Sequence, residues 1–185
     1  MIMANDAGTQ AHAAELAFAV HAAPIHAASV SRLIGYWADH GLTIRRDLRQ
    51  IVTAIDDFVV AIHDERVVGC GALETVGGGI GEIRSIAVDA AVGKVGAGRA
   101  VMEALFAKAH LRGIDTLVLL TKIPDFFTRF GFEAIEHDAV PGEYAALIAA
   151  QSGRTFEGKS IMRRVLVPTV EVRAAAPSGA ACCEP

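Results

Sequence analysis

The chain has 185 residues, 52% of them apolar, which favours one globular domain over a disordered chain. Its net charge of −4, from 17 basic and 21 acidic residues, gives no basic footprint for nucleic acid. Three cysteines do not make a disulfide framework, which favours a reducing, cytoplasmic compartment. No stretch is apolar and long enough to span a membrane, and the N-terminus lacks the basic segment of a signal peptide.

The two ends of the chain differ in composition from its centre. Residues 1–13 are small and polar, and residues 168–185 combine three prolines with scattered alanines, so we expect both ends to be disordered. Cys182 and Cys183 are then thiols of a disordered tail, with metal binding or oxidation as the alternative. One folded domain is expected to span residues 14–167.

From residue 15 onward, the spacing of apolar residues alternates between the periods of strands and of helices. Strands are expected at 15–21, 58–63, 66–75, 81–88, 115–121, 132–136 and 160–167. Helices are expected at 25–40, 44–54, 96–112 and 124–130. Asp64 and Glu65 fit the turn of a hairpin between two of the strands. This order predicts a mixed α/β fold, with an antiparallel meander followed by a crossover.

The segment GEIRSIAVDAAVGKVGAGRAV, residues 81–101, carries the most information about function. An apolar strand ends at Asp89, a turn contains Gly93, Gly96 and Gly98, and an amphipathic helix then begins. The first N–H groups of a helix lack partners within it and the helix dipole adds positive charge, so such a turn binds an anion, typically a phosphate. A dinucleotide-binding fold is not favoured, because the sequence lacks an acidic residue at the place where one would hold a ribose. A P-loop is not favoured either, because no Gly-Lys-Ser/Thr closes the turn.

The same segment resembles the acyl-CoA motif of the GNAT acetyltransferase superfamily, in which Arg/Gln-x-x-Gly-x-Gly/Ala links a strand to a helix. Gly96 and Gly98 match its two small positions, whereas Gly93 replaces the usual arginine or glutamine. DFFTRFGF, residues 125–132, is similar to the second motif of the superfamily. In order and spacing, the following segments resemble the acetyltransferase domain of N-acetylglutamate synthases: GLTIRRD, VVGCGALE, GEIRSIAVD and LVLLTKIPDFFTRFGFEAI.

This resemblance implies a single GNAT-like α/β domain that has a mixed central sheet with helices on both faces. It implies transfer of the acetyl group of acetyl-CoA to the α-amine of L-glutamate, the first step of arginine biosynthesis, without a metal. Acetyl-CoA and L-glutamate are then the small-molecule partners, with no nucleic acid and no membrane. Feedback by arginine and a homodimer are left open.

The cofactor contacts of the family fall on two segments and one aromatic residue. Backbone N–H groups around the glycine turn bind the pyrophosphate, and an N–H on the preceding strand stabilises the thioester oxyanion. The implied cofactor-binding residues are Ile86, Ala87, Val88, Lys94, Val95, Gly96, Ala97, Gly98, Arg99 and Phe127. For Arg99, the spacing fits an ordinary solvated helix residue as well as a cofactor contact. Phe126 and Phe127 stand where many relatives have a tyrosine that protonates the leaving thiolate, so that hydroxyl is missing.

Glu82 stands where several GNAT enzymes have a catalytic glutamate. We expect it to take the proton of the substrate ammonium through a water. A period of two places Glu82 and Arg84 on one face with Ile86 and Val88. A structural Glu82–Arg84 ion pair is the alternative.

The resemblance also implies residues that bind the two carboxylates of glutamate. The implied substrate-binding residues are Arg45, Arg46, Arg84, Lys122 and Ser160, with Arg45 favoured over Arg46. The family arginine two positions before Ser160 falls on Gly158, and Lys159 and Arg154 are candidates to replace it.

Two other functions stay open at this point. The chain could acetylate another amine, such as an amino-acid analogue, an antibiotic or a protein terminus. It could also be a non-catalytic acyl-CoA-binding module, which Gly93 and the missing tyrosine favour. Cys70 is expected to be a small buried residue, with a thiol close to the substrate as the alternative.

Overall fold

The structure, a computed structural model, describes residues 16–92, 94–151 and 154–166. Both ends expected to be disordered, the thiols of Cys182 and Cys183, and Gly93 lie outside these residues. The strands are β1 Phe18–His21, β2 Phe58–His63, β3 Arg66–Gly77, β4 Ile80–Val88, β5 Thr116–Thr121, β6 Glu133–Ala134 and β7 Ser160–Val165. The helices are α1 Ala27–Asp39, α2 Leu48–Thr53, α3 Ala97–Leu111, α4 Pro124–Thr128 and α5 Gly142–Ala150.

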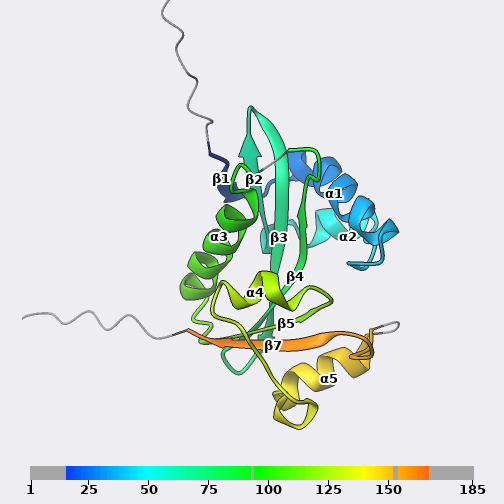
Figure 1. The fold of residues 1–185 in the computed structure, drawn as a ribbon, viewed down its shortest axis with the longest axis vertical. Helices are drawn as coiled ribbons and strands as arrows, with labels where there is room; N and C mark the ends of the chain where they lie inside the picture. The colour runs from blue at the N-terminus through cyan, green and yellow to red at the C-terminus, as the bar shows by residue number, and fades with distance from the viewer. Residues whose placement is uncertain (1–15, 93, 152–153, 167–185) are drawn as a thin grey trace, which may run out of the picture.

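Within the described residues, the strands form one mixed sheet in the order β1-β2-β3-β4-β5-β7-β6. Only the β4–β5 pair is parallel, and α3 is the crossover that joins these two strands. Helix α3 covers one face of the sheet, and α1 and α2 cover the other (Figure 1). The expected α/β domain with helices on both faces is therefore confirmed. No helix in the described segments is apolar and long enough to cross a membrane.

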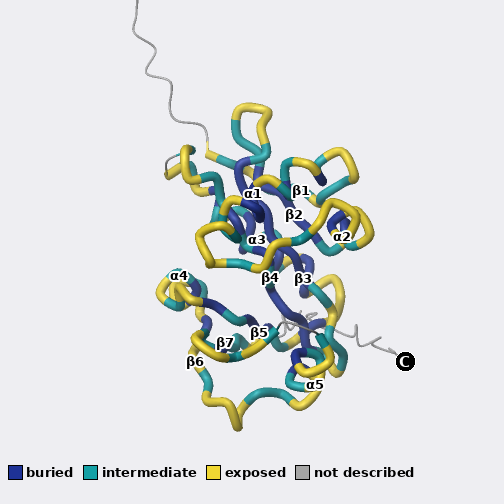
Figure 2. Tube along the Cα trace, turned by 90° about the vertical axis from the view of Figure 1, so that its right-hand side faces the viewer, coloured by how far each residue is buried: buried dark blue, intermediate teal, exposed yellow. Residues whose placement is uncertain are grey.

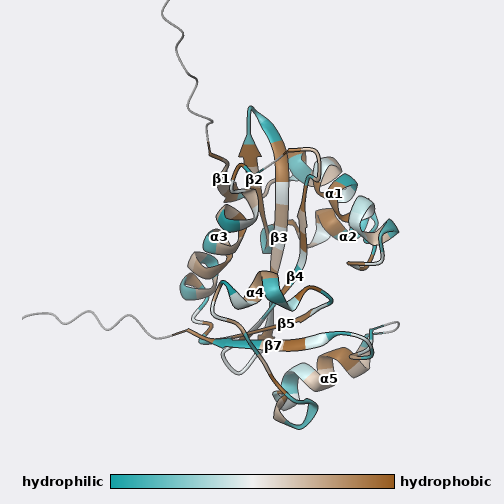
Figure 3. Ribbon diagram, in the orientation of Figure 1, coloured by the Kyte–Doolittle hydropathy of each residue, from teal (hydrophilic) through white to brown (hydrophobic). Residues whose placement is uncertain are grey.

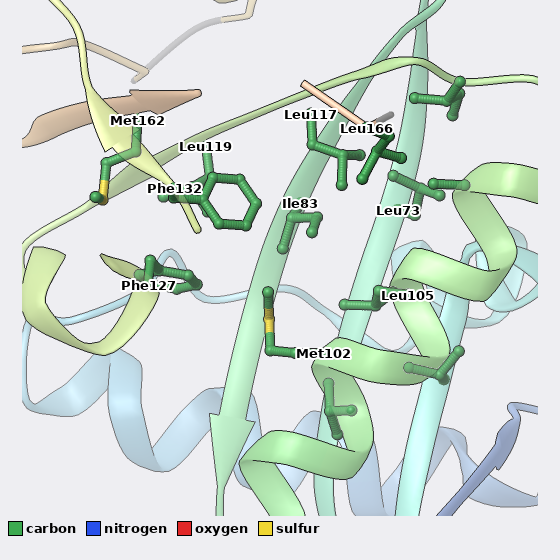
Figure 4. Packing of buried hydrophobic residues seen from close by; sticks show 14 of the residues in the cluster. Leu73, Ile83, Met102, Leu105, Leu117, Leu119, Phe127, Phe132, Met162 and Leu166 are labelled. Atoms are coloured by element: carbon green, nitrogen blue, oxygen red, sulfur yellow. The ribbon is translucent and has the colours of Figure 1, made fainter. Parts of the chain in front are cut away.

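Two hydrophobic cores hold these layers together. In the larger core, Met102 and Leu105 of α3 pack against Leu73 and Ile83 of the sheet (Figure 4). The second core lies between α1 and the opposite face, where Leu33 and Ile34 contribute fully buried side chains. The central strands are apolar along most of their length (Figure 3) and buried, whereas the loops are exposed (Figure 2). On α3, the side chains of Met102, Leu105 and Ala109 are fully buried in this core, and Phe106 is partly buried against it.

A β-bulge at Ser85 changes which face the side chains of β4 point to. Cys70 of β3 pairs with Ala87, but Ala72 pairs with Arg84, so one residue of β3 faces two residues of β4. Ser85 has a φ of 55°, a left-handed conformation that is uncommon for a residue other than glycine.

The bulge makes one expectation about β4 wrong. Ile83, Ile86 and Val88 pack toward α3, whereas Ala87 packs toward α1. An unbroken period of two would have put Ile83 and Ala87 on the same face. Glu82 and Arg84 therefore do not share a face with Ile86 and Val88, because the extra residue at Ser85 reverses the alternation.

Strands β4 and β5 diverge halfway along their length. Their parallel pairing runs only from Ile80–Thr116 to Glu82–Val118, although β4 continues to Val88 and β5 to Thr121. Beyond Glu82, the β5-facing edge of β4 has no strand partner among the residues that the structure describes. Backbone N–H and C=O groups need hydrogen-bond partners, so this free edge is a site where a ligand can add to the sheet.

The structure differs from the sequence prediction mainly in the irregular segments. The second helix was expected over 44–54 but α2 begins at Leu48, because the Asp47 side chain accepts a hydrogen bond from the Gln50 N–H at 2.7 Å and caps the helix there. Helix α5 was not predicted. Strand β6 is two residues long instead of five, and β1 begins at Phe18 instead of residue 15.

Gly71 tests how tightly α3 packs on the sheet. A Cβ added at Gly71 would lie 2.5 Å from Ile86 Cδ1 and 2.8 Å from Val101 Cγ1. Gly71→Ala is expected to lower the free energy of unfolding by about 1–3 kcal/mol, as overpacking of a close-packed core does. Gly142→Ala is the control, because no atom lies within 4 Å of its added Cβ. Equal urea midpoints for the two variants would contradict the packing.

Candidate active site

Two cavities open where β4 and β5 diverge. One is mainly apolar, with a volume of about 380 Å³, and the other is polar, with a volume of about 260 Å³. The two cavities adjoin, since they share the wall residues Leu42, Thr43, Ile83, Arg84, Ser85, Leu120 and Thr121. The arrangement offers an apolar slot along the free edge of β4 and a charged chamber next to it.

The apolar cavity contains four of the expected cofactor-binding residues. Its wall includes Ile86, Ala87 and Val88 on β4, and Phe127 on α4. The Trp37 indole also lines it and donates a hydrogen bond to the Val88 carbonyl at 2.7 Å. The cavity can therefore take an extended, largely apolar chain alongside the strand edge.

The N-terminus of α3 lies next to this apolar cavity. Gly96 is the N-cap residue, with a φ of 78° and no side-chain cap, so the first N–H groups of α3 remain available to an anion. A Cβ added at Gly98 would lie 3.2 Å from the Phe126 ring and 3.7 Å from Val88, two residues of the cavity wall. The glycine turn and the apolar slot are thus continuous.

The other expected residues of the glycine turn are mostly on the surface. Lys94 is exposed and Ala97 is buried as the first residue of α3. The Val95 carbonyl accepts a hydrogen bond from the Ala17 N–H at 2.9 Å. Arg99 is exposed and forms an i,i+4 ion pair with Glu103 at 3.4 Å, as a solvated helix residue does.

The polar cavity has more positive than negative charge. Its charged wall residues are Glu82, Arg84, Lys122, Arg154 and Lys159. Lys122 donates to the Gly41 carbonyl at 2.9 Å, and Lys159 donates to the Thr155 carbonyl at 3.0 Å. Neither ammonium has a carboxylate partner among the described residues. Burial, with Arg154 and Lys122 nearby, lowers the pKa of Lys159, so an anion in the cavity would relieve this repulsion.

Glu82 is buried and bound by residues of the following segment. Only 1% of its side chain is exposed, and both of its oxygens accept hydrogen bonds from Arg154, one of them at 2.9 Å. Tyr144 of α5 donates to the same carboxylate at 3.1 Å. Burial and the Glu82 charge raise the pKa of Tyr144, so it stays a neutral donor.

The Glu82–Arg84 ion pair of the alternative is present, but Arg84 is only the lesser partner of Glu82. Arg84 pairs mainly with Glu74, at 2.5 Å, and lies 3.8 Å from Glu82. Arg154 supplies the main counter-charge of Glu82 instead, because the chain between α5 and β7 returns over β4.

The remaining substrate-binding candidates lie outside the polar cavity. Arg45 pairs with Asp39 on the surface of α1. Arg46 lies over the Phe58 ring, with its guanidinium carbon 5.8 Å from the ring centre, and burial lowers its pKa. Both arginines line a neighbouring cavity of about 740 Å³ that shares Ile44, Arg84 and Arg154 with the polar one.

The structure brings Glu82, Arg84 and Lys122 together in one cavity. Ser160 is the first residue of β7, paired with Thr121, and is not one of the residues that line the cavity. Lys159 and Arg154, named as replacements for the missing arginine, do line it.

Sequence reasoning missed three residues of this region: Trp37, Ser85 and Tyr144. Ser85 and Trp37 left no signal, because nothing in the apolar pattern marks a bulge or an indole hydrogen bond. Tyr144 lies in the unpredicted helix α5. Cys70 is fully buried, as expected, and burial raises the pKa of its thiol to about 12. The described residues contain no group of three or more His, Cys, Asp or Glu side chains that could hold a metal.

Comparison with known proteins points to one family. Residues 54–134 match the family model described as an acetyltransferase (GNAT) domain. An amino-acid acetyltransferase of Mycobacterium tuberculosis is 33% identical over 118 residues, which cover 62% of this chain and 67% of that protein. An uncharacterised N-acetyltransferase of Chlorobaculum tepidum is 32% identical over 115 residues, which cover 62% of this chain and 74% of that protein.

Solved structures have the same fold. A Mycobacterium tuberculosis protein in complex with CoA and a second ligand is 28% identical, with a TM-score of 0.71, and the match covers 80% of this chain and 99% of that one. The N-acetylglutamate synthase of Neisseria gonorrhoeae, in complex with CoA and N-acetylglutamate, has a TM-score of 0.73 at 24% identity. The match covers 83% of this chain but 36% of that larger protein.

The Glu82–Arg154 pair gives a stability prediction. Arg154→Met would leave the buried Glu82 carboxylate without its main partner, which is expected to lower the free energy of unfolding by about 3–5 kcal/mol. Arg45→Met is the matched control, because it breaks an exposed ion pair whose loss is expected to cost about 1 kcal/mol or less. Urea unfolding of both variants measures the difference. A loss for Arg154→Met no larger than that for Arg45→Met would contradict this account of Glu82.

Proposed function

The chain belongs to the GNAT family of acetyl-CoA-dependent acetyltransferases, and from this premise we propose that it acetylates the α-amine of L-glutamate to give N-acetylglutamate, the first step of arginine biosynthesis. One observation carries the proposal: the polar cavity beside the free edge of β4 holds two ammonium groups, Lys122 and Lys159, without carboxylate partners among the described residues. Two cations match the two carboxylates of glutamate. The relative from Mycobacterium tuberculosis named amino-acid acetyltransferase supports the same class of acceptor.

The proposed cofactor position follows the apolar cavity. The pyrophosphate of acetyl-CoA binds the backbone N–H groups of residues 94–99, where Gly96 and Gly98 allow close approach and Lys94 and Arg99 add positive charge. The pantetheine arm extends along the free edge of β4, against Phe127. This brings the thioester oxygen to a backbone N–H near residues 86–88, and one such donor contributes about 3 kcal/mol to transition-state stabilisation. The CoA in the similar Mycobacterium tuberculosis structure supports cofactor binding here.

The proposed acceptor position is the polar cavity. Lys122, Lys159 and Arg84 bind the carboxylates of glutamate, which replace water in the cavity. Arg45 and Arg46 stay candidates for a carboxylate that reaches the neighbouring cavity, and Ser160 stays a candidate contact at the start of β7. Feedback by arginine and a homodimer stay open.

The proposed chemistry is direct attack of the amine on the thioester. The ammonium loses a proton to water held by Glu82, whose bonds to Arg154 and Tyr144 favour this relayed role over direct abstraction. The amine nitrogen then bonds to the thioester carbon, the carbonyl oxygen takes up negative charge, and the C–S bond breaks.

One observation favours a second acceptor class. The cavity of about 740 Å³ is joined to the polar cavity through Arg84 and Arg154, which offers room for an amine with an anionic group further from the nitrogen than in glutamate.

Release of CoA from acetyl-CoA with a panel of amino acids and acidic dipeptides at a pH near 8 tests the proposal. Fastest turnover with glutamate is the expected result. Turnover confined to the larger acidic amines would support the second acceptor class. CoA binding without turnover of any amine would contradict both acceptor classes.

Removal of either free ammonium is expected to weaken acceptor binding. Lys122→Met and Lys159→Met should each raise the KM for glutamate about 10-fold or more, because a hydrogen bond to a charged group contributes roughly 1.5–3 kcal/mol. Arg66→Met is the charge-matched control, since Arg66 is exposed and lines none of these cavities.

The effect should also depend on pH. Burial lowers the pKa of Lys159, so this group loses its charge at a lower pH than an ordinary lysine. The wild-type KM for glutamate is therefore expected to rise as the pH becomes alkaline, and to rise less in Lys159→Met. An unchanged KM in both lysine variants would count against the polar cavity as the acceptor site.

Gly96 provides a test of the cofactor site. Its φ of 78° disfavours any side chain, and a left-handed non-glycine residue costs about 1–2 kcal/mol, so Gly96→Ala should raise the KM for acetyl-CoA roughly 10-fold. Gly113→Ala is the matched control, because Gly113 follows the other end of α3 with a φ of 64° and no atom within 4 Å of the added Cβ. The control should lose stability without a change in this KM. Equal KM values for both variants would argue against a cofactor at the glycine turn.

A further inference from the structure

Acetyl transfer leaves a proton to be delivered to the CoA sulfur. Phe126 and Phe127, which line the apolar cavity, carry no hydroxyl. Tyr144 is fully buried, and its hydroxyl is bound to Glu82. Both oxygens of Glu82 are occupied by Arg154. The proton therefore needs another carrier between the amine and the sulfur.

Ser85 has an unusual backbone conformation at the centre of this region. Its φ of 55° occurs inside β4, where the strand bulges, and the Cys70 thiol donates to its carbonyl at 3.7 Å. A left-handed conformation in a residue other than glycine costs free energy, and such residues cluster at functional sites. Glycine would adopt the same bulge without this cost. The presence of serine in spite of the cost indicates a role for its side chain.

The location of Ser85 suits a proton carrier. It lines both the apolar cavity and the polar cavity, so it lies where the thioester and the amine of the proposed reaction would meet. Its side chain has no hydrogen-bond partner among the described residues. Thr121 lines both cavities as well, but its hydroxyl already accepts the Ile123 N–H at 3.0 Å.

We propose that the Ser85 hydroxyl carries the proton from the attacking nitrogen to the leaving sulfur. The inference rests on the proposed acetyl transfer but not on glutamate as the acceptor. Of the two protons that an ammonium loses, the first leaves to solvent through water before attack. After the N–C bond forms, the nitrogen gives its second proton to the Ser85 oxygen while the Ser85 hydroxyl gives its own proton to the sulfur and the C–S bond breaks. The hydroxyl is thereby restored, and no other reactant is consumed.

Two variants separate the hydroxyl from the backbone. Ser85→Gly removes the hydroxyl and relaxes the bulge, whereas Ser85→Ala removes the hydroxyl and keeps the strain. If the hydroxyl carries the proton, both variants should lower kcat by a similar factor, about 100-fold or more, with little change in the KM for acetyl-CoA. Ser85→Cys retains a group that can exchange a proton and should recover part of kcat with a shifted pH profile.

The comparison uses the amine that the wild type acetylates fastest, so a wrong assignment of glutamate does not affect it. Ser31→Ala, which removes a hydroxyl from α1 outside both cavities, is the control and should keep the wild-type kcat. Thermal melting verifies that each variant is folded. The proposal is overturned if Ser85→Gly retains kcat within about threefold of wild type. If Ser85→Ala is then also active, the hydroxyl is dispensable. If Ser85→Ala is then impaired, Ser85 has only a backbone role.

Discussion

The divergence of β4 and β5 beyond the Glu82–Val118 pair is the constraint on which the rest of the site depends. If β4 and β5 were paired along their full length, the backbone of residues 83–88 would be buried within the sheet. Within the described part of the chain, that edge is left without a strand partner, and the two adjoining cavities lie beside it. Because unpaired backbone groups need hydrogen-bond partners, the fold itself creates a binding edge, and the N-terminus of α3 lies at its end.

The charges of the site are arranged in two ways. Glu74, Arg84, Glu82 and Arg154 neutralise one another in a largely buried chain of ion pairs across β3 and β4. Such a chain contributes little net stability as a whole, but it is costly to break, so it fixes the segment between α5 and β7 over the sheet. The ammonium groups of Lys159 in that segment and of Lys122 directly after β5 have no carboxylate partner among the described residues, which leaves them available to an anion. The carboxylate expected to act in catalysis thus also helps to build the polar cavity proposed for the acceptor.

Much of the architecture could be predicted from the sequence, because long apolar periods specify α1, α3 and the central strands. Gly96 and Gly98 were singled out from the sequence, and the structure gives each a reason for glycine: a left-handed N-cap at Gly96 and a close contact at Gly98. The bulge could not be predicted: GEIRSIAVD reads as an unbroken strand, and one extra residue at Ser85 reverses the faces that follow. The partner of Glu82 was missed because Arg154 is distant in sequence and α5 has no clear amphipathic pattern.

Backbone amide hydrogen exchange of β4, with and without CoA, tests the free edge most directly. The amides of residues 83–88 that point toward β5 are expected to exchange rapidly in the free protein and to slow markedly when CoA is bound, while those of β2 and β3 change little. Protection of these amides in the free protein, or no change on addition of saturating CoA, would contradict the claim that the cofactor binds along this edge.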